Sequence, residues 1–116
     1  MALKKKVVIR WNGATGNYMA VQEANYNNTD KLLRYTVALY ANEQARRDGL
    51  APLSVVYNGC TDNIPDGNAV AAAYADIQAQ LDNLDTWIEL SGEDPGVVKP
   101  VKESDLYRLF HGAETV

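Results

Sequence analysis

The chain has 116 residues, of which 47% are hydrophobic and 22% charged, with a formal net charge of −4 and a pI of about 4.8. This composition predicts one globular domain with its own core and argues against a disordered chain. The acidic balance disfavours nucleic acid, which needs a basic face, and no run approaches the ~20 apolar residues of a membrane span. With Cys60 as its one cysteine, the chain can form no internal disulfide, which is typical of a reducing compartment.

Alternating apolar residues predict four β-strands in the first half of the chain. They are expected at residues 5–11, 17–26, 32–40 and 53–57. Between the last two, good helix formers from Glu43 to Arg47 followed by Gly49 predict a short helical turn. Because the connections are short, the four strands favour an antiparallel meander.

One clear helix is expected after a loop over 58–68, with Asn68 as its N-cap. Its apolar residues recur at helical spacing: Val70, Tyr74, Ile77, Leu81 and Leu84. The helix is expected to end at 83–85, leaving 86–90 as a closing strand or a tail on the core, with Trp87 half-buried. The predicted fold class is therefore α+β, a four-stranded antiparallel sheet with one helix packed on a face, plus an extended C-terminal arm.

The last part of the chain changes in composition. Residues 91–103 contain two prolines and two glycines and predict an extended linker between an α+β domain at 1–90 and a docking arm at 104–116. Four apolar or aromatic residues of the arm are the predicted partner-binding residues: Leu106, Tyr107, Leu109 and Phe110. Because one or two helical turns are unstable alone, the arm must dock, either on its own domain or on a neighbouring copy or another partner.

The residue types indicate no active site. Cys60 and His111 are the only cysteine and histidine, too few for a conventional zinc site. As a nucleophile–base pair they lack a third residue that would orient the base, although an enzyme using Cys60 stays an alternative. No phosphate loop, dinucleotide fingerprint or calcium loop occurs, so no catalytic residue, metal or cofactor is expected. The seven tyrosines suit half-buried sheets and protein interfaces.

One stretch carries a resemblance to a protein family. A strand from Tyr35 leads to a turn with Glu43, Ala45 and Arg46, and then to Gly49 and Pro52-Leu53 before the next strand; a loop and an Ala-rich helix around Ala73-Tyr74 follow. This order, over about Val7 to Leu84, resembles small structural and accessory proteins of tailed bacteriophages. The shared motif is structural and brings no active site.

The resemblance implies a non-enzymatic virion component, such as a part of the baseplate, a tail-fibre attachment or a capsid accessory, assembled in the host cytoplasm. Its expected partners are copies of itself and other virion proteins, bound through the sheet and helix surface and the C-terminal arm, in a homo-oligomer or larger assembly. No nucleic acid and no membrane are expected as partners. The alternative function is a small cytosolic adaptor that binds a host or regulatory protein.

Overall fold

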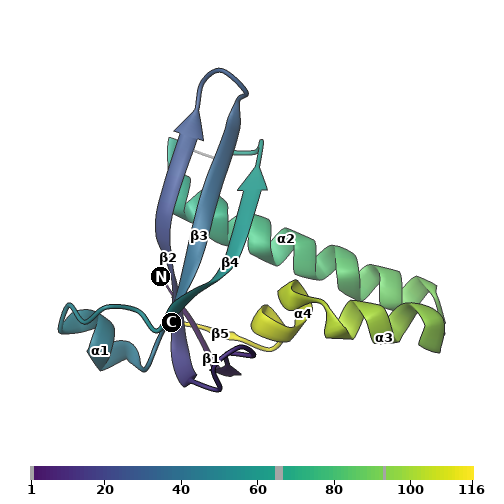
Figure 1. Ribbon diagram of the computed structural model, residues 1–116. Coiled ribbons are helices and arrows are strands. Elements are labelled where there is room, and N and C mark those ends of the chain that lie inside the picture. Colours follow the sequence, from purple (N-terminus) through teal and green to yellow (C-terminus); the bar gives the residue numbers. More distant parts are fainter. Residues whose placement is uncertain (1, 65–66, 93) are drawn as a thin grey trace.

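The computed structural model describes residues 2–64, 67–92 and 94–116, and within them the chain is α+β, with an antiparallel sheet and helices (Figure 1). The strands are β1 (Leu3–Val8), β2 (Thr15–Asn27), β3 (Leu32–Tyr40), β4 (Ser54–Thr61) and β5 (Glu114–Thr115). The helices are α1 (Glu43–Arg47), α2 (Ala69–Leu90), α3 (Pro95–Glu103) and α4 (Asp105–Phe110). The strand order is β4-β3-β2-β1-β5.

The first four strands pair with their sequence neighbours, as a meander requires. The sheet differs from the predicted four strands by β5, which returns antiparallel to β1 and pairs Thr115 with Leu3. Backbone hydrogen bonds of 2.9 Å between Ala2 and Val116 extend this pairing. A strand of two residues is too short to show alternation, so the sequence gives no sign of it.

The core lies between one face of the sheet and the helices α2 and α4. Its buried members are Val7, Ile9, Met19, Val21, Tyr35, Val37, Leu39, Ala73, Tyr74, Ile77, Leu81, Leu109 and Phe110. A smaller apolar cluster containing Tyr18, Ala20, Ala38 and Tyr40 lies on the other face. There the Arg46 guanidinium of α1 lies 6.0 and 5.9 Å from the ring centroids of Tyr18 and Tyr40, a cation–π distance.

Helix α2 begins as predicted, because Asn68 Oδ1 accepts a 3.0 Å hydrogen bond from the Ala71 N–H. The predicted end at 83–85 is wrong, and so is a closing strand at 86–90, because the helix runs to Leu90. The reason is that Ile88 continues the spacing of Leu81 and Leu84, which favours helix as strongly as the short alternation favours strand. Trp87 is consequently exposed and not half-buried.

The predicted extended linker at 91–103 is also wrong over most of its length, since it contains α3. Asp94 caps this helix by accepting a 2.9 Å hydrogen bond from the Gly96 N–H. Pro95 occupies the first helical position, where its missing N–H costs nothing. Part of the predicted loop 58–68 is strand as well, because β4 extends to Thr61.

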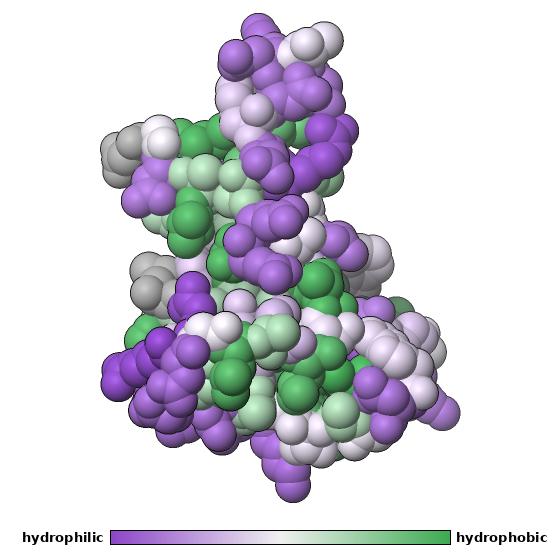
Figure 2. Space-filling model, turned by 60° about the vertical axis from the view of Figure 1, so that its left-hand side comes forward, coloured by the Kyte–Doolittle hydropathy of each residue, from purple (hydrophilic) through white to green (hydrophobic). Residues whose placement is uncertain are grey.

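Two elements project from the body of the molecule. The β2–β3 hairpin extends beyond the neighbouring strands, and α2 continues past the edge of the sheet at β4 (Figure 1). The end of the hairpin is hydrophilic on the face that Figure 2 shows, whereas apolar side chains gather over the lower body. The principal extents of 45 × 38 × 24 Å reflect this open shape.

Candidate partner-binding surface

The four predicted partner-binding residues lie on α4, and the structure places them differently. Leu109 and Phe110 are buried in the core, where the rings of Phe110 and Tyr57 form a T-shaped pair at a centroid distance of 5.2 Å. Leu106 is half-buried against the same core, and Tyr107 is half-buried and stacks on His111 at 4.2 Å. Of the two docking modes considered, this chain adopts the one in which the arm packs on its own domain.

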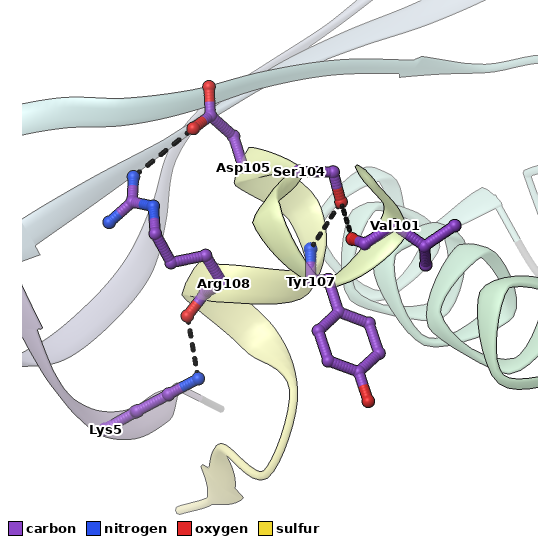
Figure 3. Close-up of polar contacts among 6 residues, drawn as sticks. All are labelled: Lys5, Val101, Ser104, Asp105, Tyr107 and Arg108. Carbon is purple, nitrogen blue, oxygen red and sulfur yellow. Dashed lines mark hydrogen bonds and ion pairs between the residues drawn. The ribbon is translucent and has the colours of Figure 1, made fainter. Parts of the chain in front are cut away.

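Hydrogen bonds at both ends fix α4 in this position (Figure 3). Ser104 Oγ caps the helix by accepting from the Tyr107 N–H at 3.3 Å and donates to the Val101 carbonyl at 2.7 Å. At the other end, Lys5 Nζ of β1 donates to the carbonyl oxygens of Arg108 and His111, both at 2.7 Å. A cation at the C-terminal end of a helix also interacts favourably with its dipole.

Sequence reasoning missed the role of Lys5. Three consecutive lysines near a terminus are expected to be exposed to solvent. Side chains alternate along β1, however, so Lys5 lies on the same face as Leu3 and Val7, whereas Lys4 and Lys6 are exposed. The alternation was the signal that could have found it. Burial and, after it, the nearby Arg108 guanidinium hold the pKa of Lys5 below its usual value.

A polar cluster ties α2 to the central strand and the edge strand. The Tyr35 hydroxyl of β3 donates a 2.6 Å hydrogen bond to Asp76 Oδ2, and Gln80 Nε2 donates to the same oxygen at 2.7 Å. The Gln80 side chain also lies next to the Tyr57 hydroxyl of β4. Burial, and secondarily the Asp76 carboxylate, raise the pKa values of both Tyr35 and Tyr57.

Gly59 of β4 makes room for this cluster. A β-carbon at this position would collide with the ring and hydroxyl of Tyr35, which therefore lies directly beneath the strand backbone. The absence of a side chain lets Tyr35 reach Asp76 on the helix. The glycine accordingly reflects a close approach and not a turn.

Helix α2 crosses three neighbouring strands one after another. The Val21 N–H of β2 donates to the Tyr74 hydroxyl at 3.0 Å, Asp76 accepts from Tyr35 of β3, and Gln80 lies next to Tyr57 of β4. From Tyr74 to Gln80 a helix rises about 9 Å, close to the spacing of about 9.6 Å between a strand and its second neighbour. Each further helical turn of α2 thus lies beyond the last strand.

The part of α2 beyond Gln80 carries exposed apolar side chains. Trp87 is 61% exposed and Leu90 is 83% exposed, and both line a shallow hollow with Asn83, Thr86 and Ser91. Asn83 and Trp87 follow Gln80 at spacings of three and seven, so all three residues share one face of α2. At Gln80 this face is turned toward β4, and at Asn83 and Trp87 no strand lies next to it. We call residues 83–90 the overhang.

The strand beside the overhang has a free edge. Among the described residues β4 pairs only with β3, and its eight residues Ser54–Thr61 contain no charge and no proline. Proteins usually protect edge strands with lysine, proline or bulges. β4 has only an irregularity at Val56, whereas β1, near the opposite edge, carries three lysines and is covered by β5.

A second apolar hollow, of about 290 Å³, lies between α2 and the C-terminal segment. Leu3, Tyr74, Ile77, Leu81 and Phe110 line it with other small or polar side chains. These are mostly core residues, and no ionisable group other than the Tyr74 hydroxyl, which binds the Val21 amide, faces it. Among the described residues, its lining contains no carboxylate, imidazole, thiol or amine.

In the ranges 2–64, 67–92 and 94–116, no three His, Cys, Asp or Glu side chains lie close enough together to hold a metal ion. Cys60 is exposed on β4. Of the helices described here, even α2 has no stretch apolar enough to cross a bilayer. Comparison with known proteins gave no match: no family model, no curated protein and no solved structure is significantly similar to this chain.

Proposed function

We propose that this chain is a non-enzymatic assembly subunit of a tailed-bacteriophage particle, assembled in the host cytoplasm, that binds other virion proteins. The observation that carries the binding role is the joint exposure of the β4 edge and the overhang. A tryptophan that is 61% exposed, on the part of α2 that continues past the uncharged edge strand β4 (Figure 1), is the kind of surface that soluble proteins use for association.

The particular assembly rests on the sequence resemblance, which runs from the strand at Tyr35 through the turn with Glu43 and Arg46 to the helix around Tyr74. β4 lies within this stretch, whereas most of the overhang of α2 follows its end at Leu84. Of the predicted arm residues, Leu106 and Tyr107 reach the surface and are the ones that add to an interface without unfolding of α4.

The protein content of purified particles tests this function. Particles from the source of this sequence are banded by density, washed at high salt and analysed by quantitative mass spectrometry. We expect peptides of this chain in a fixed ratio to the other virion proteins. Recovery only in the soluble lysate, with a host protein attached, would overturn the proposal and favour the cytosolic adaptor.

A further inference from the structure

We propose that the free edge of β4 accepts an extended segment of another protein as a sixth strand, which packs on the overhang of α2. This deepens the proposed function, on which it rests for the existence of a protein partner. It goes further in naming the bound element, its backbone pairing and the side chains that it covers.

Helix α2 continues beyond the last strand of the sheet, so its final turns have no strand packed on them (Figure 1). A residue of α2 adjoins each strand from β2 to β4: Tyr74 and Asp76 hydrogen-bond residues of β2 and β3, and Gln80 lies next to Tyr57 of β4. One strand spacing of about 4.8 Å corresponds to about three residues of helical rise. A strand added next to β4 would therefore cross α2 at Asn83. Trp87 lies one helical turn further along α2, beyond the free edge of the added strand.

The outer edge of β4 can form hydrogen bonds with another strand. Alternate backbone N–H and C=O groups of an edge strand point outward without a partner, so an incoming strand gains a ladder of main-chain hydrogen bonds. The strand has no charged side chain that would oppose this. Side chains of the incoming strand that point toward the helix layer would cover Trp87, so alternate residues of the partner should be apolar.

The position of α2 across β4 limits which molecule can supply the added strand. Tyr57, which α2 crosses, lies in the middle of β4. If two copies paired their β4 edges in register about a two-fold axis, the overhang of each copy would fall where the other copy's α2 already lies. In this register the helix layer of a second copy would overlap with the first, whereas an extended segment without a helix layer fits.

Charge adds to the description of the partner. Asp62 follows β4 directly, Asp82 is exposed on α2, and the chain has a net charge of −4. A segment with lysine or arginine flanking its apolar alternation is favoured over an acidic one. The occupant is therefore an extended basic–apolar segment of a different protein.

Selection from a library of random twelve-residue peptides on the immobilised full chain tests this inference. We expect the selected peptides to alternate apolar residues and to carry basic flanks. Their affinity should fall at least tenfold on Trp87→Asp and change less than twofold on Trp11→Asp. Trp11 is the matched control, because it is 69% exposed in the turn between β1 and β2.

A scan of N-methylated versions of one selected peptide then tests the backbone pairing. Methyl groups on alternate amides should abolish binding, and those on the amides between them should not, because only every second amide of an added strand faces β4. Selection of no peptide, binding insensitive to Trp87→Asp, or uniform tolerance of methylation would overturn the inference. So would a homodimer that Trp87→Asp dissociates.

The two tests fail separately. Particles that contain the chain in fixed ratio while no extended peptide binds would retain the virion function and reject the added strand. Peptide binding with the expected alternation, but with no chain in particles, would retain the strand site and assign it to an adaptor.

Discussion

Two short helical segments with apolar side chains, α4 and the overhang of α2, differ in how far those side chains are buried. Helix α4 buries Leu109 and Phe110 completely, whereas the overhang leaves Trp87 and Leu90 in solvent. Both lie at the side of the same sheet, and both are rich in large apolar residues. The difference arises because α4 lies under existing strands, while the overhang lies beyond the last one. Burial is decided by where the sheet ends and not by the hydrophobicity of the segment.

The largest effect is expected from Phe110→Ala. The ring is fully buried against Tyr57, so its removal leaves a cavity and should lower the free energy of unfolding by about 3–5 kcal/mol. Urea denaturation followed by circular dichroism measures this, with Leu90→Ala as the exposed control. A loss below about 1 kcal/mol would show that α4 is not packed in solution and would return the arm to a role in partner binding.

The next effect concerns the cluster that aims α2 across the sheet. Tyr35→Phe removes the 2.6 Å hydrogen bond to Asp76 and should cost about 1–2 kcal/mol, because a partly buried carboxylate loses a donor. The same denaturation experiment detects it. Tyr26→Phe, at an exposed tyrosine of the hairpin, is the control and should be neutral.

The same tyrosines predict how stability depends on alkaline pH. The folded pKa of Tyr35 is raised above its unfolded value of 10.0, and those of Tyr57 and Tyr74 move in the same direction. The unfolded state then releases protons first, so stability should be full below pH 10 and fall as the pH rises above it. Lys5, whose pKa is lowered below 10.5, acts in the opposite direction.

Urea midpoints measured at several pH values between about 9 and 11 give this slope. In Tyr35→Phe the stability should fall less steeply with rising pH, because one of the tyrosines with a raised folded-state pKa is removed. An unchanged slope in the variant would mean that Tyr35 titrates alike in both states, which would contradict its burial and its bond to Asp76.

A smaller and more local effect is expected at the end of α4. Lys5→Met keeps most of the apolar stem but removes the donor to the Arg108 and His111 carbonyls, at a cost of about 1 kcal/mol. Amide hydrogen exchange should accelerate in α4 and β5 and stay unchanged in β3. Lys6→Met is the control, since Lys6 is exposed; equal effects of the two variants would argue against a specific cap.

The smallest effect on stability is expected at the overhang itself. Trp87→Ser should change the free energy of unfolding by less than about 0.5 kcal/mol, as at other exposed positions. This sharpens the contrast with Phe110, because both residues are large aromatics on helices. A loss near that of Phe110→Ala would mean that Trp87 is already covered in solution, for instance by a second copy.

Much of the fold followed from the sequence alone, because its determinants are local. The alternation in 32–40 predicts a strand with one face on the core, and the structure also buries Ala38 and Tyr40 on the other face. Asn68 and Ser104 cap helices with their own side chains. The meander also followed, since short connections leave adjacent strands little choice but to pair antiparallel. The helical turn at Glu43–Arg47 formed as predicted for the same reason.

Tertiary structure decided what depends on distant partners. The range 91–103 is predicted as a linker because two prolines and two glycines have poor helix propensity, yet Pro95–Glu103 fold as α3, which packs against α2 and α4. Lys5 donates to the carbonyl oxygens of Arg108 and His111, which are more than a hundred residues away in the sequence. No local sequence pattern can predict such a contact. The candidate site was missed for the same reason: the sequence contains Trp87 and β4, but only the packed sheet determines that it ends at β4 and leaves both uncovered.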